Sequence, residues 1–239
     1  MKSSGPLRPI LLTGASRGLG LEFTRQWLAA GHRVFALARD PEASRGLREL
    51  SARHPGALVT CPCDVSDDAS VAAARLRVGE LTDRLDLVLN NAGTYGPGED
   101  ELSTLDLAEA RRVFEVNTLG PLRVSRAFLP PLRRGDRPKL VHITSLMGSI
   151  ADNRSGSALA YRMSKAALNM ASRNLALELA PNGIPSVVLH PGWVKTDMGG
   201  PRAPLPVEEA VAALIKTIDL LTAEHSGGFF DREGRPAPW

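Results

Sequence analysis

Hydrophobic residues along the chain gather in short unbroken runs, and longer stretches with helical spacing separate these runs. The runs are rich in Val, Leu and Ile and show no polar alternation, which is typical of strands buried on both faces of a parallel sheet. The expected strands are residues 9–13, 33–38, 57–61, 85–90, 139–145 and 186–190, with a shorter one at 227–230.

Apolar residues recur at helical spacing between these strands, most clearly at 19–31, 41–54, 67–81 and 105–132. Because strands and helices alternate regularly, we predict right-handed crossovers and a doubly wound α/β Rossmann domain with a mostly parallel seven-stranded sheet. No repeat or linker-like segment interrupts the pattern, so we expect a single domain over residues 1–239. Ligands of such sheets bind beyond the carboxyl ends of the strands, where the strand order reverses.

Composition and charge exclude several classes of protein. With 43% hydrophobic and 23% charged residues, the chain resembles folded globular proteins. No run reaches the roughly 18 uncharged apolar residues that span a membrane, and the first residues do not resemble a signal peptide. We therefore expect a cytoplasmic protein that binds no membrane. The net charge of +3 is spread among acidic residues, which argues against nucleic acid as a partner.

Cys61 and Cys63 form a C-P-C pair at the end of an expected strand. Alternation in a strand places both side chains on one face. Two thiols cannot complete a zinc site, and no histidine lies at ligand spacing from them. We expect structural cysteines and no metal.

A glycine-rich stretch, TGASRGLG at 13–20, follows the first expected strand. Glycines permit a tight turn that points backbone N–H groups at an anion above a helix N-terminus. Glycines also occur at strand–helix turns for structural reasons alone, but the position after the first strand favours binding of a dinucleotide pyrophosphate. The candidate contacts are Gly14, Ser16, Arg17, Gly18, Leu19 and Gly20.

The second expected strand ends in FALARD, where Arg39 stands in place of the acidic residue that often binds a ribose 2′-hydroxyl. Arg17 adds a second cation nearby. Arginines in this position can bind a 2′-phosphate, so we favour NADP(H). NAD(H) remains an alternative, because Asp40 follows and can bind a ribose hydroxyl.

Tyr161 and Lys165 lie four residues apart in an alanine-rich helical pattern, which places them on one helix face. A phenol with a pKa of about 10 needs a shift of roughly 3 units, or about 4 kcal/mol, to act near neutral pH. An ammonium group about 4 Å away supplies about that energy at an effective dielectric constant near 20. Ser145, at the end of the fifth strand, can hydrogen-bond a substrate oxygen or only cap a turn. Asn117 can hold a water or only satisfy a helix backbone.

These motifs occur in the order found in one family. The motifs TGASRGLG, NNAG at 90–93 and PGWVKTDM at 191–198, together with Asn117, Ser145, Tyr161 and Lys165, resemble the classical short-chain dehydrogenase/reductase family over nearly the whole chain. The stretch after 191 and the ending SGGFFDREGRPAPW look most like the subgroup that contains C-factor and the Sniffer-type carbonyl reductases.

The resemblance implies roles for single residues. Tyr161 is then the general acid in reduction, and Lys165 holds the nicotinamide ribose and lowers the phenol pKa. Ser145 orients the substrate, and Asn117 links a water to Lys165. The remaining implied cofactor contacts are Asp64 and Val65 at the adenine, Asn90 at the end of the fourth strand, and Val194 and Thr196 at the carboxamide. Residues 105–132 often form an interface in this family, so a homodimer or homotetramer is expected.

Two departures from the family pattern concern the substrate. The loop between Ser145 and Tyr161 is longer than in many relatives, and the segment after Thr196 is short where many carry a lid. We infer an open site for bulky or varied carbonyls. The leading hypothesis is an NADPH-dependent reductase of aldehydes, ketones or quinones, acting on a small-molecule carbonyl or, in reverse, an alcohol. The alternative is a dinucleotide-binding sensor or C-factor-like signalling protein with little turnover.

Overall fold

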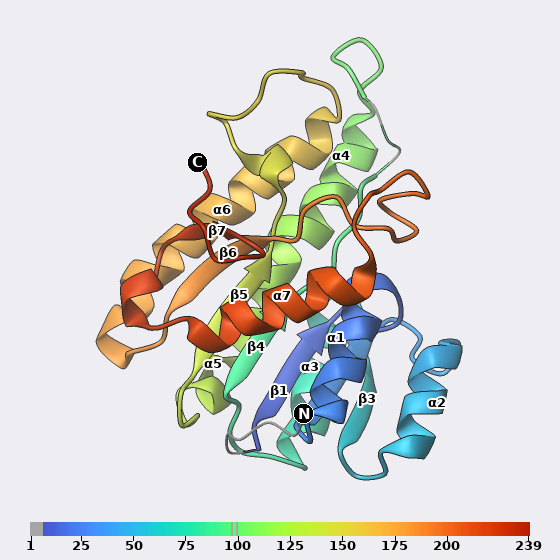
Figure 1. The fold of residues 1–239 in the computed structure, drawn as a ribbon, viewed down its shortest axis with the longest axis vertical. Coiled ribbons are helices and arrows are strands. Elements are labelled where there is room, and N and C mark those ends of the chain that lie inside the picture. Colours follow the sequence, from blue (N-terminus) through green and yellow to red (C-terminus); the bar gives the residue numbers. More distant parts are fainter. Residues whose placement is uncertain (1–6, 97, 99) are drawn as a thin grey trace.

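The computed structural model describes residues 7–96, 98 and 100–239 and shows one α/β domain built on a seven-stranded sheet (Figure 1). All strand pairs are parallel, in the order β3-β2-β1-β4-β5-β6-β7. The strands are β1 (Pro9–Thr13), β2 (Arg33–Ala38), β3 (Leu58–Pro62), β4 (Leu87–Asn90), β5 (Lys139–Ile143), β6 (Ser186–His190) and β7 (Phe229–Asp231). The helices are α1 (Gly18–Ala29), α2 (Arg45–Arg53), α3 (Asp68–Gly79), α4 (Leu107–Phe114), α5 (Gly120–Leu132), α6 (Leu159–Leu179) and α7 (Val207–Leu220).

Helices cover both faces of the sheet, and each face carries its own hydrophobic core. Side chains of α1, α2 and α7, among them Phe23, Leu47 and Leu214, pack on one face. Side chains of α3, α5 and α6, among them Val78, Phe128 and Leu179, pack on the other. Because both faces are covered, β1, β2, β4 and β5 contain almost only buried residues, which explains their unbroken hydrophobic runs.

The predicted fold is confirmed, and the sheet is entirely rather than mostly parallel. The bounds differ at the polar strand ends. The fifth strand ends at Ile143 rather than residue 145, because the Ser145 hydroxyl accepts a hydrogen bond from Met147 N and starts a short 3-10 turn, Leu146–Gly148. The fourth begins at Leu87 rather than residue 85. The predicted domain bounds of 1–239 stay a prediction.

The helical pattern predicted at 105–132 consists of two helices with a π-helical turn between them. This turn, η1 (Glu115–Leu119), is closed by a hydrogen bond from Gly120 N to Glu115 O. Pro121 follows after Gly120 and has no N–H to donate to the preceding turn. The wider π turn accommodates this proline, so α4 and α5 remain one continuous helical segment. The π turn places Asn117 in the interior.

The strand order reverses between β1 and its neighbours β2 and β4. The carboxyl ends of β1, β4 and β5 meet at one edge of the sheet, and the glycine loop, the NNAG motif and Ser145 follow these ends. The parallel topology therefore brings together motifs that lie more than one hundred residues apart in the chain.

Candidate active site

The glycine loop makes a turn that other residues cannot make. Gly14 and Gly18 have φ of +69° and +52°, in the left-handed region that favours glycine. A Cβ on Gly20 would collide with the main-chain oxygen of Gly14. Within the described residues, α1 begins after Arg17 without a side-chain capping hydrogen bond. Its first-turn N–H groups are therefore suited to bind a phosphate.

Asn91 holds this loop from the neighbouring strand. Its side-chain amide donates to the main-chain oxygens of Thr13 at 2.9 Å and Gly14 at 3.3 Å. The Thr13 hydroxyl in turn accepts from Asn91 N and Ala92 N at 3.1 and 3.0 Å. The second asparagine of NNAG therefore fixes the shape of the glycine loop.

The side chain of Asn90, which was expected near the cofactor, points into the protein instead. It is buried, and its amide lies 3.1 Å from both Ser125 Oγ and His142 Nδ1.

Charged residues surround the ends of β2 and β3. Hydrogen bonds from the hydroxyl and the N–H of Ser66 lower the pKa of the Asp64 carboxyl, and the nearby guanidinium of Arg39 lowers it further. Arg39 itself is exposed directly after β2. Asp40 accepts from Ala43 N at 2.9 Å, so one of its oxygens serves the local turn. Val65 is buried beside Asp64.

Arg17 does not lie free beside Arg39. Its guanidinium pairs with Asp197 at 3.2 Å, and this ion pair joins the glycine loop to the segment after β6. Both side chains are exposed, so this ion pair is weak. Thr196 lies next to the same loop, because its methyl group is 3.4 Å from the position of a Cβ on Gly18. Val194 is buried and forms a β-bridge with Leu205.

Ser145 and Tyr161 meet at the carboxyl end of β5. The Ser145 hydroxyl lies close enough to the Tyr161 phenol for hydrogen bonding to lower the phenol pKa, and the ring of Tyr95 lies 4.8 Å from the Tyr161 ring. Lys165 lies one helical turn further along α6, with Nζ 5.7 Å from the centre of the Tyr161 ring and 3.0 Å from Ile143 O. The structure thus places three of the four predicted catalytic side chains together.

The pKa of Tyr161 differs from the sequence-based expectation. Burial raises the pKa of the phenol to about 12, although the hydrogen bond from Ser145 lowers it. Burial also lowers the pKa of Lys165 to about 8. We predicted that Lys165 would lower the pKa of the phenol. In the protein without a cofactor the phenol pKa is raised instead, because desolvation of Tyr161 and Lys165 is the larger effect.

Asn117, the fourth predicted residue, is fully buried and connects two parts of the site. Its Oδ1 accepts from Thr94 N at 2.8 Å, and its Nδ2 donates to Thr94 O at 2.8 Å and Ser164 Oγ at 3.0 Å. These bonds tie the loop after NNAG to α6. They also engage both polar atoms of the side chain, so a water would use the main chain of Asn117 or the remaining lone pair of Oδ1.

Two further contacts fix α6 against the sheet. A Cβ on Gly148 would lie 2.8 Å from Lys165 Cβ, so glycine permits the turn after Ser145 to lie directly on α6. Thr144 Oγ1 donates to Asn169 Oδ1 at 2.7 Å. The relative positions of Ser145, Tyr161 and Lys165 are therefore determined by packing rather than by the flexible lengths of the side chains.

Comparison with known proteins agrees with this geometry. The model of the short chain dehydrogenase family matches residues 8–204 of this chain. The chain belongs to the short-chain dehydrogenase/reductase family.

Three similar proteins show which part of the family this chain is most like. C-signal of Myxococcus xanthus is 51% identical over 158 residues, which are 66% of this chain and 95% of that protein. The structure of carbonyl reductase Sniffer of D. melanogaster has a TM-score of 0.94 at 31% identity. The NADPH-bound carbonyl reductase from chicken fatty liver has a TM-score of 0.92 at 38% identity. Both structures cover 98% of this chain and are themselves covered completely. The predicted resemblance to the C-factor and Sniffer-type subgroup is confirmed.

Some residues of this dehydrogenase/reductase site were not predicted from the sequence. Asn91 belongs to the NNAG motif and Tyr95 follows it by two residues, so the motif itself was the signal that could have identified both. Asp100 had no such signal. It lies far from α6 in the chain, yet its carboxylate accepts from Ala160 N at 3.1 Å, in the first turn of the helix that carries Tyr161.

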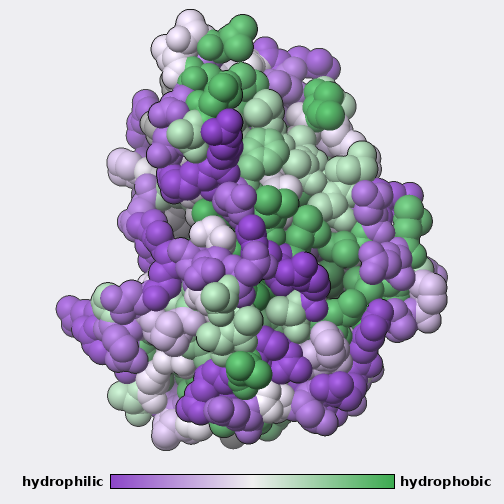
Figure 2. Space-filling view, turned by 180° about the vertical axis from the view of Figure 1, so that it is seen from behind, coloured by the Kyte–Doolittle hydropathy of each residue, from purple (hydrophilic) through white to green (hydrophobic). Residues whose placement is uncertain are grey.

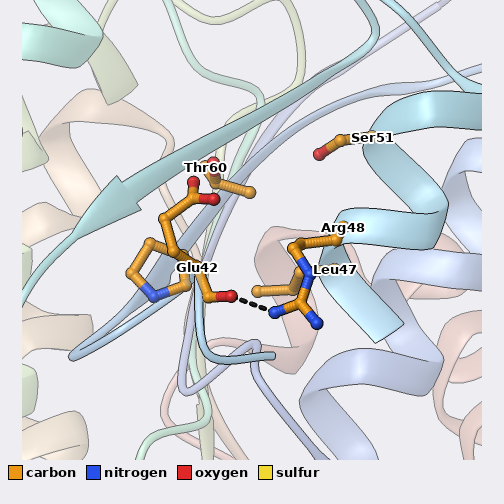
Figure 3. Close-up of a pocket in the computed structure, with 6 residues that line it drawn as sticks. Glu42, Leu47, Arg48, Ser51 and Thr60 are labelled. Atoms are coloured by element: carbon orange, nitrogen blue, oxygen red, sulfur yellow. Dashed lines mark hydrogen bonds between the residues drawn. The ribbon is translucent and has the colours of Figure 1, made fainter. Parts of the chain in front are cut away.

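A separate pocket lies between α2 and the middle of β3 (Figure 3). Leu47 and Thr60 line it, and the guanidinium of Arg48 is bound to the main-chain oxygen of Glu42. None of the predicted site residues lines this pocket. It is a gap in the packing of α2 against the sheet.

Cys61 and Cys63 are buried and free, and burial raises the pKa of both thiols, that of Cys63 to about 12. The prediction that they are structural agrees with this burial. Among the described residues, no cluster of His, Cys, Asp and Glu is suited to a metal ion, and no helix is long and apolar enough to cross a membrane.

Proposed function

We propose that this protein is an NADPH-dependent reductase that converts a small-molecule aldehyde, ketone or quinone to the alcohol. The observation that carries the proposal is that Ser145 lies beside Tyr161 and Lys165, at the same sheet edge as the glycine loop. The family membership and the NADPH-bound carbonyl reductase of the same fold support it.

Tyr161 is the proton donor in this proposal. Because its pKa is about 12, the phenol is protonated at neutral pH, as a general acid for reduction must be. Ser145 hydrogen-bonds the carbonyl oxygen and directs it toward the phenol. A nicotinamide cofactor held at this site would supply the hydride for the carbonyl carbon. One hydride and the Tyr161 proton together give the alcohol, and the phenolate that remains is stabilised by Ser145 and by protonated Lys165.

The residues at the carboxyl ends of β1, β2 and β3 fit a dinucleotide phosphate. The turn at Gly14 and Gly18 and the first-turn N–H groups of α1 would hold the pyrophosphate. Arg39 is exposed at the end of β2 and would bind the 2′-phosphate. Arg17, in the glycine loop, is paired with Asp197. Asp64 and Val65 would contact the adenine, and Val194 and Thr196 the carboxamide. The Asp40 turn engages one carboxylate oxygen, which favours NADP(H) while leaving NAD(H) as the alternative.

Asn117 acts in the proposal through its main chain. Its side chain is bound to Thr94 and Ser164, so a water that relays protons to Lys165 would bind a carbonyl group of the π turn. Such turns leave main-chain groups outside the regular helical pattern and often occur at functional sites.

The site favours bulky or varied carbonyls. Trp193 is exposed directly before Val194, with its indole N–H donating to Gly199 O at 2.7 Å, and the rings of Tyr95 and Tyr161 pack against each other. The chain passes directly from Thr196 to α7 with only a short connecting segment. A strict preference for one small ketone across a substrate panel would contradict this part of the proposal.

We also propose that two or more copies associate through α6. Met163, Met170 and Leu177 recur every seven residues and are 41%, 63% and 64% exposed, so they form an apolar stripe along the helix. Hydrophobic residues gather on this face of the molecule, opposite α1 and α7 (Figure 2). An uncovered stripe of this kind is typical of an interface.

A cytoplasmic location stays a prediction from the sequence.

A signalling protein with little turnover is the second candidate function. The 51% identity to C-signal favours it. Ser145, Tyr161 and Lys165 have no chemical purpose in a pure sensor, so the reductase is the better supported function.

The test is oxidation of NADPH by the purified protein with a panel of aldehydes, ketones and quinones. We expect turnover that falls by at least about 1,000-fold in Tyr161→Phe, because the variant keeps the ring but has no proton to donate. The affinity for NADPH, measured by fluorescence titration, should be nearly unchanged. Saturable NADPH binding without turnover in the native protein would favour the sensor, and a fully active Tyr161→Phe would refute the mechanism.

A further inference from the structure

The last residues of the sequence fold back along the edge of the sheet. After β7, the Asp231 carboxylate accepts from Glu233 N and Arg235 N, both at 2.9 Å, and Gly234 has φ of +80°. The reversed chain then runs antiparallel to β7, with Ala237 N donating to Phe229 O at 2.8 Å. We call residues 236–239 the edge strap.

The edge strap ends in Trp239, which makes contacts of two kinds. Its indole ring lies 5.5 Å from the ring of buried Phe229. Its main-chain oxygen accepts from Ala151 N at 2.7 Å and from the hydroxyl of buried Ser149 at 3.1 Å. The ring is thus anchored on the sheet while the oxygen binds another segment.

That segment is the loop at 149–158, which joins the turn after Ser145 to Tyr161 and which we call the substrate loop. Figure 1 shows the end of the chain beside this loop, ahead of α6. Trp239 holds the near end of the substrate loop. Arg162 holds the far end, because its guanidinium donates to Gly156 O at 2.8 Å, Ser157 O at 3.0 Å and Ser155 Oγ at 2.9 Å.

The substrate loop depends on such contacts for its shape. Residues 151–157 are exposed, so little hydrophobic burial stabilises them. Ser157 and Ala158 both have positive φ, at 55° and 47°, a conformation that costs energy in residues other than glycine. A strained and exposed segment keeps one conformation only where neighbouring groups hold it.

We propose that Trp239 is a positioning residue that orders the substrate loop and thereby determines which carbonyls reach Tyr161. Ser145 and Tyr161 lie at the two ends of the connection that contains this loop, so a shift of the loop changes the space for a bulky substituent while the catalytic side chains stay in place. The consequence for substrates rests on the proposed function, whereas the ordering of the loop does not.

The ordering is tested by amide hydrogen exchange with three chains: Trp239→Phe, Trp239→Ala and a chain that ends at Pro238. The first keeps both the ring and the oxygen, the second loses the ring, and the third loses both. We expect exchange in peptides covering 149–158 to rise by about fivefold to tenfold in the shortened chain, the factor that corresponds to a lost hydrogen bond. Trp239→Ala should lie between, and Trp239→Phe should match the native protein. Unchanged exchange in both Trp239→Ala and the shortened chain would overturn the proposal.

The effect on specificity is tested by steady-state kinetics with a bulky and a small carbonyl. We expect the KM of the bulky substrate to rise by about fivefold or more in the shortened chain, with the KM of the small substrate, both kcat values and the NADPH affinity within twofold of native. A strap that only protects the sheet edge would lower the unfolding temperature and leave the KM ratio unchanged, which would overturn the specificity claim. If the native protein shows no turnover, the proposed function fails, and the exchange experiment alone decides whether Trp239 orders the loop.

Discussion

Tyr161 and Lys165 show how strongly burial acts on the chemistry of single residues. Lys165 has a pKa of about 8 instead of 10.5, so the unfolded chain binds more protons between these values and stability rises with pH there. The phenol of Tyr161 has the opposite effect, because its pKa is raised from 10 to about 12 and stability falls as pH rises between these values. Below about pH 8 the protein holds a charged lysine in a desolvated place, and packing of α6 must offset that cost.

The proposed preference for NADP(H) also depends on single residues, and Arg39→Ala tests it. Arg39→Ala should raise the dissociation constant of NADPH by about tenfold, because a charge-assisted hydrogen bond to the 2′-phosphate is lost. The dissociation constant of NADH should change by less than about twofold. Fluorescence titration with both cofactors measures the difference.

Arg45→Ala is the matched control for Arg39→Ala, because Arg45 is an exposed arginine on nearby α2 that pairs with Glu49. It should leave both affinities unchanged. Equal weakening of NADPH and NADH in Arg39→Ala would remove the reason for preferring NADP(H).

At the scale of elements, α6 begins in an unusual way. Its N-cap position is Ala158, which has no side-chain oxygen and a left-handed backbone. The buried carboxylate of Asp100 replaces the cap by accepting from Ala160 N at 3.1 Å. Since Tyr161 lies in the first turn of α6, a residue sixty positions before Ala160 fixes the start of the helix that carries Tyr161.

Asp100→Ala should therefore affect both stability and activity. We expect the free energy of unfolding to fall by about 1–2 kcal/mol, the usual effect of losing an N-cap. We also expect kcat to fall by about tenfold or more, because the first turn of α6 loosens around Tyr161. Urea unfolding and steady-state kinetics measure the two effects.

Asp106→Ala separates the two effects, because Asp106 caps α4 in the ordinary way through Ala108 N at 2.7 Å. It should lower stability by a similar amount and leave kcat within about twofold, given that it caps another helix. If both variants changed kcat equally, the link between Asp100 and Tyr161 would be wrong.

At the scale of the whole molecule, the two faces of the sheet are covered differently. The side chains of α1 and α7 form a packed layer, whereas α6 on the other face carries the exposed stripe of Met163, Met170 and Leu177. In a symmetric dimer such a stripe can meet its own copy, because the same patch faces itself across a two-fold axis.

Met170→Lys combined with Leu177→Lys should convert the associated protein to monomers at micromolar concentration. Charges placed opposite each other in an apolar interface repel and lose hydration. Light scattering coupled to size-exclusion chromatography gives the mass. Leu76→Lys, at a 73% exposed position on α3, is the control and should not change it. A native protein that is already monomeric would contradict the proposed interface.

The fold class, the order of the strands along the chain and the identity of the motif residues were all predictable from the amino-acid sequence. They were predictable because buried parallel strands require unbroken apolar runs, and tight turns such as the one at Gly14 and Gly18 require glycine. Both requirements are local, so they are visible in a short stretch of residues. The spacing of Tyr161 and Lys165 was equally visible, because a helix places residues four apart on one face.

The sequence did not reveal which side chains contact one another or how burial changes their pKa values, because both depend on the tertiary structure. Asn90 and Asn91 are adjacent in the chain, yet one is buried against His142 and the other holds the glycine loop. The pKa of Tyr161 rises because α6 packs into the interior, a desolvation that the i,i+4 spacing does not reveal. The contacts of Asp100 with α6 and of Trp239 with the substrate loop join residues about sixty and ninety positions apart. Such contacts depend on how the elements are arranged in space, and no local pattern of residues records that arrangement.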